Sequence, residues 1–273
     1  MAEVIDGILI REVETKNIMT KSSLPVGGYS VNPYVGCTHA CKYCYASFMK
    51  RFTGHTEEWG TFLDVKHWPE IKNPKKYAGQ RVVIGSVTDG YNPQEEQFGN
   101  TRKLLEQLIG SDADILICTK SDLVARDIDL LKKLGRVTVS WSINTLDENF
   151  KNDMDSASSI ERRISAMKQV YEAGIRTVCF VSPVFPGITD FEAIFERVKD
   201  QCDLFWLENL NLRGGFKKTI MDYIAGKYPD LVPLYDEIYN KHNRSYFEAL
   251  EVKAAEMAKK YDCPFVDNEM PYG

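Results

Sequence analysis

The feature that most constrains this chain is a group of three cysteines, Cys37, Cys41 and Cys44, spaced CxxxCxxC. Three thiolates this close in sequence can hold one metal centre. They cannot fully ligate a [4Fe–4S] cluster, because each iron takes its own external ligand. One iron would remain open to a ligand that is not protein. The spacing therefore predicts a metal centre with a vacant coordination site, where chemistry can occur.

Three other interpretations of these cysteines are possible. A disulfide framework is disfavoured because the chain is long, three is an odd count and no signal peptide precedes the cysteines. A zinc site would need a fourth ligand, which His39 or His55 could supply. Chance clustering of buried cysteines is the third. The spacing favours the iron–sulfur cluster over all of them.

The remaining cysteines, Cys118, Cys179, Cys202 and Cys263, have no ligand spacing, so we do not expect a second cluster. Cys118 and Cys179 lie within apolar runs and are predicted to be small core residues.

Composition narrows the class of protein. The chain has 273 residues, 44% hydrophobic and 27% charged, as expected for a soluble globular protein with a large core. No apolar run is long enough to cross a membrane, and the acidic N-terminus lacks the plan of a secretory signal. We therefore expect a cytoplasmic protein. The net charge of −5 gives no global attraction for nucleic acid, which favours a small-molecule or peptide substrate.

Short apolar runs alternate with helical patterns from residue 31 onward. The predicted strands are Val31–Gly36, Arg81–Asp89, Asp114–Lys120, Arg136–Asn144, Arg176–Val184 and Cys202–Leu210. The predicted helices are Lys42–Phe52, Phe98–Ile109, a segment from Ser121 or Asp122 to Leu134, Ile160–Ala173 and Phe191–Asp200. Near-continuous apolar strands separated by helices predict an α/β fold with a parallel sheet. The periodicity alone does not separate a barrel from an open doubly wound sheet.

Polar residues end each predicted strand, and ligands collect at the carboxyl ends of parallel strands. The residues at these ends are Ser86, Thr88, Asp89, Thr119, Lys120, Ser140, Ser142, Asn144, Ser182, Glu208, Asn209 and Asn211. Any one of them could be a helix cap or a turn residue. Because all the strands end this way, we expect a shared site. Lys120 stands out, since an ammonium group after an apolar strand suits a carboxylate ligand.

The cysteine spacing with Tyr43 before the last cysteine resembles the signature of the radical SAM superfamily. The surrounding stretch, NPYVGCTHACKYCYASFMKRFTGHTEEWGTFLDVK, resembles the branch related to spore photoproduct lyase, and the likeness extends over residues 29–210. It implies a partial (β/α)6 barrel of the TIM type. It also implies that Cys37, Cys41 and Cys44 hold a [4Fe–4S] cluster whose fourth iron is chelated by S-adenosylmethionine. An electron from a reducing partner such as flavodoxin or ferredoxin would then yield a 5′-deoxyadenosyl radical that abstracts hydrogen from an unidentified substrate.

The resemblance also implies roles for individual residues. Lys120 and Ser142 match positions that contact the methionine end of S-adenosylmethionine. Further cofactor contacts are predicted at Thr88 and Asp89 (ribose or amino group), Val181 and Ser182 (backbone contact with adenine), Arg163 (carboxylate, unless it is a solvated helix charge) and Tyr43 (stacking near the cluster or adenine). Tyr45 is expected to pack.

One departure from the resemblance concerns a hydrogen-donating cysteine. Spore photoproduct lyase has such a cysteine near the end of its second strand, where this chain reads SVTDGYNP. Its absence argues against thymine-dimer repair, although a DNA photoproduct lyase remains an alternative. Tyr91 is the candidate hydrogen relay in its place.

We divide the chain into a lead-in over residues 1–30, a radical SAM barrel over 31–210 and a helical extension over 211–273 that closes part of the barrel. The extension is expected to contain helices at Phe216–Gly226, Asp230–His242 and Asn243–Tyr261, and a final short strand in its tail. The rival interpretation from another class is a non-catalytic zinc or iron–sulfur module that acts through a partner. The sequence does not indicate an oligomeric state.

Overall fold

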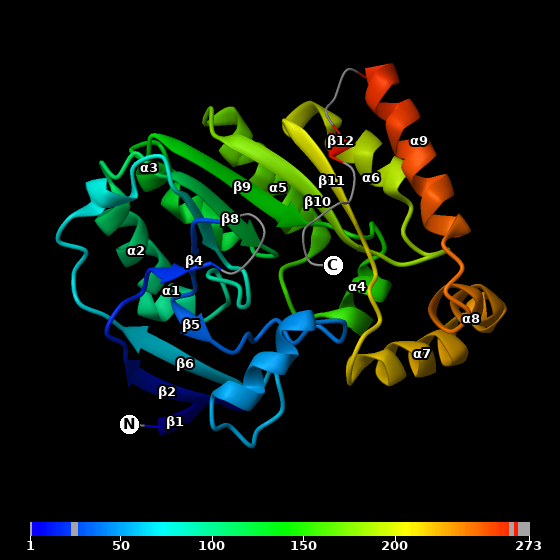
Figure 1. The fold of residues 1–273 in the computed structure, drawn as a ribbon, viewed down its shortest axis with the longest axis horizontal. Coiled ribbons are helices and arrows are strands. Elements are labelled where there is room, and N and C mark those ends of the chain that lie inside the picture. The colour runs from blue at the N-terminus through cyan, green and yellow to red at the C-terminus, as the bar shows by residue number, and fades with distance from the viewer. Residues whose placement is uncertain (1, 23–26, 262–264, 267–273) are drawn as a thin grey trace.

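The structure is a computed structural model that describes residues 2–22, 27–261 and 265–266 (Figure 1). Its main sheet has eight strands in the order β12-β11-β10-β9-β8-β7-β4-β3. Their bounds are β3 Thr20–Lys21, β4 Tyr29–Val31, β7 Arg81–Ile84, β8 Asp114–Thr119, β9 Arg136–Ser142, β10 Arg176–Val184, β11 Leu204–Asn209 and β12 Phe265–Val266.

All neighbouring strands of the main sheet are parallel except β3 and β4. From β4 to β12 the strands follow one another in sequence order, without the reversal that a doubly wound sheet contains. In the described part of the chain β3 and β12 are the edges, so the sheet is open. This confirms the predicted α/β fold.

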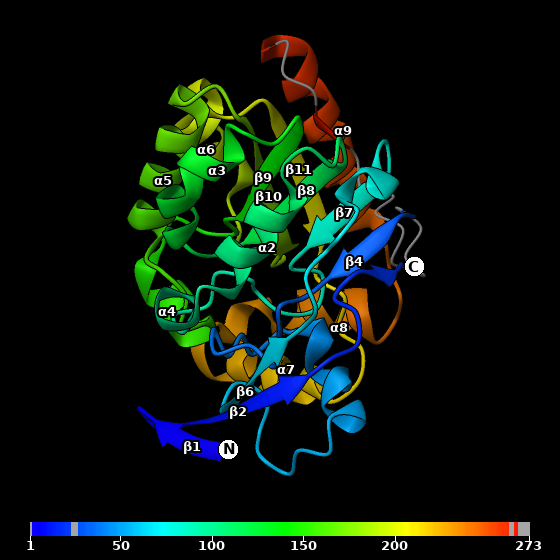
Figure 2. The same cartoon turned by 90° about the vertical axis from the view of Figure 1, so that its left-hand side faces the viewer.

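Helices cover the outer face of this sheet (Figure 2). Those between its strands are α1 Glu95–Phe98, α2 Asn100–Leu108, α3 Ile128–Leu131, α4 Glu148–Met154, α5 Ile160–Glu172 and α6 Phe191–Val198. Side chains start three of them: Asp147 caps α4, Ser159 caps α5 and Asp190 caps α6. Each occupies an orphan N–H group of the first helical turn.

Two predicted helices differ from the structure. The segment before Leu134 is a short 3₁₀ helix, η3 (Leu123–Asp127), followed by α3; Asp122 precedes η3, but its carboxylate binds Ser158 and Arg162 and caps no backbone N–H. After the cysteines the helix is also 3₁₀, η1 (Tyr45–Phe52), with Cys44 as its N-cap residue, and not the predicted Lys42–Phe52. The other 3₁₀ segments are η2 Pro74–Tyr77, η4 Lys199–Gln201 and η5 Pro229–Leu231.

A second sheet of four strands was largely missed by the sequence analysis. Its order is β1-β2-β6-β5, with bounds β1 Ala2–Ile5, β2 Ile8–Glu14, β6 Phe62–His67 and β5 Tyr34–Val35. The predicted strand Val31–Gly36 is split between the two sheets, since β4 ends at Val31 and β5 begins at Tyr34. Pro33 lies at the break, and proline lacks the N–H that a strand ladder needs.

Residues after 211 form α7 Phe216–Lys227, α8 Val232–Tyr239 and α9 Ser245–Tyr261, close to the predicted bounds. Ile220, Ile224 and Tyr235 from these helices form a buried cluster with Tyr43 and Phe185. The C-terminal helices therefore pack against the segment that carries the cysteines. The short strand β12 pairs with β11, while Cys263 lies outside the described residues. Among the residues described, we find no helix long and apolar enough to cross a membrane.

Candidate functional site

A cavity of about 380 Å³ extends from Arg81 and Leu116 within the main sheet to the loop that carries the cysteines. Eleven of the residues predicted from sequence line it: Cys37, Cys41, Cys44, Ser86, Thr88, Asp89, Thr119, Lys120, Ser142, Ser182 and Glu208. Residues as far apart in the chain as Cys37 and Glu208 therefore face one space. This convergence is what the polar strand ends predicted.

Local backbone geometry shapes the cysteine loop. Ala40 N donates to Cys37 O at 3.2 Å and Cys44 N donates to Cys41 O at 3.1 Å, which folds the loop into two successive turns. Gly36 precedes them with φ of +86°, and a Cβ there would lie 2.4 Å from the carbonyl oxygen of Phe62. Only glycine fits this position.

The three thiols are desolvated. Burial raises the pKa of Cys37 to about 12, and burial also raises the pKa values of Cys41 and Cys44. Such thiols form thiolates only when a cation compensates the buried charge. The iron ions of a cluster are cations of this kind, so the donor set fits one.

The geometry does not favour zinc. In residues 2–22, 27–261 and 265–266, no three His, Cys, Asp or Glu side chains are close enough to hold one metal ion. Thiolates of a [4Fe–4S] cluster each bind a different iron and so stand further apart. His55 is occupied, since its ring nitrogens lie 2.9 Å from Glu57 and from Asp64.

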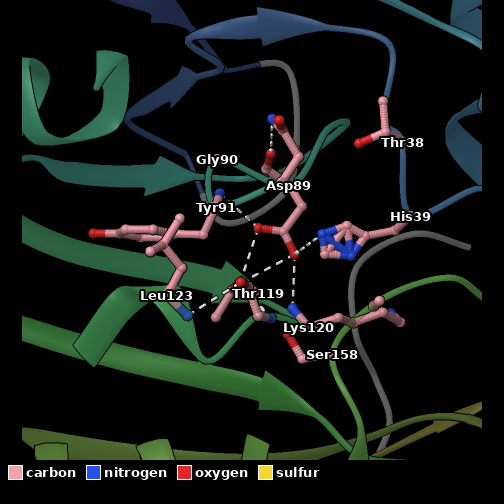
Figure 3. A network of polar contacts seen from close by, with 12 residues as sticks. Thr38, His39, Asp89, Gly90, Tyr91, Thr119, Lys120, Leu123 and Ser158 are labelled. Carbon is pink, nitrogen blue, oxygen red and sulfur yellow. Dashed lines mark hydrogen bonds and ion pairs between the residues drawn. The ribbon is translucent and has the colours of Figure 1, made fainter. Parts of the chain in front are cut away.

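Asp89 is the centre of a polar network beside the cysteines (Figure 3). Its carboxylate accepts hydrogen bonds from Tyr91 N at 2.8 Å, Lys120 N at 2.7 Å and Thr119 Oγ1 at 2.9 Å. Three donors thus occupy most of its acceptor capacity. Asp89 therefore fixes the backbone of Lys120 and joins the loops after β7 and β8.

His39 faces the same network from within the cysteine loop (Figure 3). Its Nε2 lies 3.8 Å from Asp89 Oδ2, and burial lowers its pKa, so the ring is neutral at pH 7. Neither ring nitrogen has a hydrogen-bond partner among the described residues, although the ring is buried and lines the cavity. Buried polar atoms of this kind normally meet a ligand or an ordered water. This observation, like the thiols, fits a cavity built to hold a polar group.

Lys120 follows β8 and lines the cavity, with its Nζ 5.6 Å from the centre of the Tyr43 ring. The Tyr43 ring itself is not part of the cavity lining. It packs edge-to-face on Phe185 at 5.5 Å, and its hydroxyl donates to Asp155 at 3.1 Å. Tyr45 lines the cavity instead, and its hydroxyl donates to the Ser86 carbonyl. The structure thus places the Tyr43 ring against Phe185 and Asp155 and brings Tyr45, which was expected to pack, to the cavity instead.

Arg163 lies behind the cavity wall. It is 1% exposed and donates to Asp155 Oδ1 at 2.8 Å, Ser158 O at 2.8 Å and Ser142 O at 3.1 Å. It is therefore not a solvated helix charge. It positions Ser142 through the backbone and neutralises Asp155, and it does not line the cavity.

The structure places three further predicted residues. The side chain of Val181 lies in the core, so the backbone contact predicted for it stays a prediction, and its neighbours Phe180 and Ser182 line the cavity. The Thr88 hydroxyl donates to the Gly36 carbonyl, so it supports the cysteine loop. Tyr91 is fully buried and its hydroxyl donates to Asp127 at 3.1 Å. It does not line the cavity, and this is the physical reason to withdraw it as a hydrogen relay.

Several lining residues were missed. Cys118 lines the cavity, contrary to its prediction as a core residue, and so do Phe180 and Trp206, whereas Glu208 was expected there as a strand-end residue. Period-two alternation could have found them, because Cys118 precedes Lys120 by two positions on one strand face. Burial raises the pKa of the Cys118 thiol to about 12, so it carries its proton at pH 7. Burial also raises the pKa of Glu208, which accepts a hydrogen bond from Ser182.

Comparison with known proteins agrees with this geometry. The model of the Radical SAM superfamily matches residues 31–198. An uncharacterized protein of Methanocaldococcus jannaschii is 36% identical over 236 residues, which is 86% of this chain and 88% of that protein. A "Radical SAM Nalpha-GlyT isomerase" of Pseudomonas phage M6 is 27% identical over 180 residues, 64% of this chain but only 36% of that protein.

Among solved structures, spore photoproduct lyase with bound AdoMet and dinucleoside spore photoproduct has the same fold. The TM-score is 0.60 at 19% identity, and the match covers 81% of this chain and 66% of that one. The family model spans more than half of this chain, and the cysteine loop lies within it. The chain is an enzyme of the radical SAM superfamily.

Proposed function

We propose that this enzyme cleaves S-adenosylmethionine reductively at a [4Fe–4S] cluster held by Cys37, Cys41 and Cys44. When bound, the cluster and cofactor would supply a 5′-deoxyadenosyl radical that takes hydrogen from the substrate. The observation that carries the proposal is that three desolvated thiols from one loop face the same cavity as Lys120 and Ser142. A non-catalytic binding module would not require these groups to converge.

In this proposal Lys120 binds the cofactor carboxylate through its ammonium group. Two features of the chain prepare it for that role. The backbone N–H of Lys120 donates to the Asp89 carboxylate at 2.7 Å, and the Lys120 Nζ lies over the face of the Tyr43 ring. Ser142 is held from behind by Arg163, and Ser182 offers a further hydroxyl on the neighbouring strand. These supports limit the motion of the groups that orient the cofactor.

The barrel interior provides shielding from water. We assign the barrel to residues 31–210 and its partial closure to the helices after residue 211, which pack beneath the cysteine loop through Tyr43 and Phe185. Exclusion of water protects a reactive intermediate from side reactions. The apolar side chains of Leu116, Phe180 and Trp206 form part of the cavity lining.

Cys118 is our candidate hydrogen donor. Its protonated thiol faces the cavity two positions before Lys120, whereas the spore photoproduct lyase branch carries its donor cysteine on the preceding strand. Transfer of the S–H hydrogen to a substrate radical would leave the unpaired electron on sulfur. The position therefore allows hydrogen return without the cysteine that SVTDGYNP lacks.

A DNA photoproduct lyase remains the second candidate. It is supported by the shared fold with spore photoproduct lyase, whose structure contains a dinucleoside spore photoproduct. The net charge of −5 argues for a small molecule or peptide instead.

The test is anaerobic reconstitution with iron and sulfide, followed by S-adenosylmethionine and dithionite, with 5′-deoxyadenosine as the product. We expect formation by the wild type and by Cys202→Ala, a matched cysteine variant away from the cavity, but not by Cys41→Ala. Equal product from Cys41→Ala and the wild type would refute the assignment of the ligands. Incubation of the reconstituted enzyme with a dinucleoside photoproduct tests the second candidate. Only a photoproduct lyase would convert this compound into intact thymidines.

A further inference from the structure

The helix that follows the cysteines carries an unusually exposed aromatic surface. Phe48 is 44% exposed and Phe52 is 70% exposed. The Arg51 guanidinium lies 5.5 Å from the centre of one ring and 5.6 Å from the other, so the three side chains form one unit. Together with Lys50 we call this the η1 surface. Apolar groups gathered on a surface in this way commonly mark an interaction site.

The η1 surface is preformed. Lys50 Nζ donates to Thr56 O at 2.9 Å and Arg51 Nε donates to Phe48 O at 3.1 Å. Beneath it, His55 stacks on Phe62 at 3.8 Å. A shallow groove of about 510 Å³ runs along the surface. Because the Phe52 ring is mostly exposed, it contributes little to the hydrophobic core. Stabilisation of the fold therefore does not explain why an aromatic residue occupies this position.

The charge of the η1 surface is opposite to that of the whole chain. Lys50 and Arg51 line the groove, and no carboxylate of the described residues lines it with them. Glu57, which follows in sequence, is engaged by His55 and Arg11. The chain as a whole carries −5. A local basic and aromatic surface on an acidic protein attracts an acidic partner, and it disfavours a symmetric contact in which two copies present this same surface to each other.

The position of the surface indicates what the partner does. Cys44, a proposed cluster ligand, is the N-cap residue of η1, and Tyr45 in the same helix lines the cavity. An eight-residue 3₁₀ helix is roughly 16 Å long at about 2 Å per residue. A protein docked on Phe48 and Phe52 is thus brought close to the cluster ligands without entering the cavity.

We propose that the η1 surface is the docking site of an acidic one-electron carrier protein that reduces the cluster. This inference rests on the proposed function, which needs one electron for each cleavage. The carrier is oxidised by one electron, the cluster is reduced by one electron, and no bond is made or broken. Phe48 and Phe52 supply the apolar centre of the contact, while Lys50 and Arg51 select an acidic partner.

The experiment compares two reductants on the cluster-loaded enzyme by stopped-flow absorbance. One is a reduced, acidic flavodoxin and the other is dithionite, which needs no docking surface. The variants are Arg51→Glu and Phe52→Ser. The matched control is Lys168→Glu, which makes the same change of charge at an exposed position on α5.

We expect Arg51→Glu to slow reduction by flavodoxin about tenfold at low salt and to weaken its dependence on ionic strength, because charge reversal acts mainly on association. Phe52→Ser should slow reduction of the cluster by flavodoxin at all salt concentrations. Dithionite rates should stay unchanged, and Lys168→Glu should behave as the wild type with both reductants.

If flavodoxin reduced both η1 variants as fast as it reduces the wild-type enzyme, and dithionite reduction were normal, the proposed function would stand while the docking proposal would be overturned. Equal slowing with both reductants would also overturn it, because the cluster itself would then be altered. Loss of affinity for single-stranded DNA in Arg51→Glu, with flavodoxin rates intact, would replace the carrier by nucleic acid. A wild type without a reducible cluster would overturn the proposed function together with this inference.

Discussion

Replacement of Arg163 by methionine tests the buried support of the site. Arg163 and Asp155 form an ion pair at 2.8 Å in which each side chain is 1% exposed. Removing one partner of a buried pair costs about 3–5 kcal/mol, because the other charge stays buried without compensation. Arg163 also satisfies the carbonyls of Ser142 and Ser158. We therefore expect Arg163→Met to lower the free energy of unfolding by about 3–5 kcal/mol.

The neighbouring residue provides the control. Arg162, on the same helix α5 as Arg163, is 67% exposed and pairs at 2.7 Å with Asp122, which precedes η3. An exposed pair contributes about 1 kcal/mol or less, so Arg162→Met should change stability by no more than that. Urea unfolding followed by circular dichroism measures both variants. Equal losses, or a loss below about 1 kcal/mol in Arg163→Met, would refute the reasoning.

The dependence of the free energy of unfolding on pH gives an independent check of the Arg163–Asp155 pair. Burial alone would raise the pKa of Asp155, but the charges of Arg163 and Lys120 outweigh it and hold that pKa below its usual value. The pair therefore stabilises the wild type above the unfolded-state pKa of about 3.9, and this is lost as pH falls through the lower folded-state pKa. Without Arg163 the pKa of Asp155 should rise. The loss of stability in Arg163→Met should then become smaller as pH falls through the raised pKa of Asp155, because protonation removes the buried charge.

Three further changes have distinct expected results. Gly36→Ala should lower the free energy of unfolding by about 1–3 kcal/mol in urea, because φ of +86° and the Phe62 carbonyl leave no room for a Cβ. Lys120→Met should weaken S-adenosylmethionine binding about tenfold or more in calorimetry, with unchanged iron content; equal affinity would contradict its role. Cys118→Ala should keep about four irons per chain and form 5′-deoxyadenosine, whereas loss of iron would make Cys118 a ligand.

Most of the parallel strands were predictable because the pattern that marks a buried strand lies within the strand's own sequence. Apolar runs such as RVVI and DILICT lie in strands β7 and β8, and buried strands need little more than such runs. The second sheet was missed for the opposite reason. Strand β6 (FLDVKH) lacks regular alternation, and its partner β2 lies 53 residues earlier, from Leu9 paired with Phe62. Pairing at that distance leaves no mark within either segment.

Predictions for the site failed where the direction of a side chain decides whether the residue reaches the cavity. Tyr43 and Tyr45 are two residues apart, yet only Tyr45 lines the cavity, since Asp155 and Phe185 hold the ring of Tyr43. Tyr91 follows a strand end but turns into the core to meet Asp127. A position at the end of a strand predicts nearness to the site and does not predict which way the side chain points.

The sequence by itself determined the chemistry available to this protein, because the CxxxCxxC spacing and the alternation of strands and helices are local properties of the chain. The tertiary structure decided which groups share the cavity. Asp89 became the residue that fixes Lys120, and Arg163 the one that supports Ser142, through contacts between residues 31 and 21 positions apart in the chain. Such roles depend on which donors and acceptors meet when distant segments fold together, and only the folded chain contains that information.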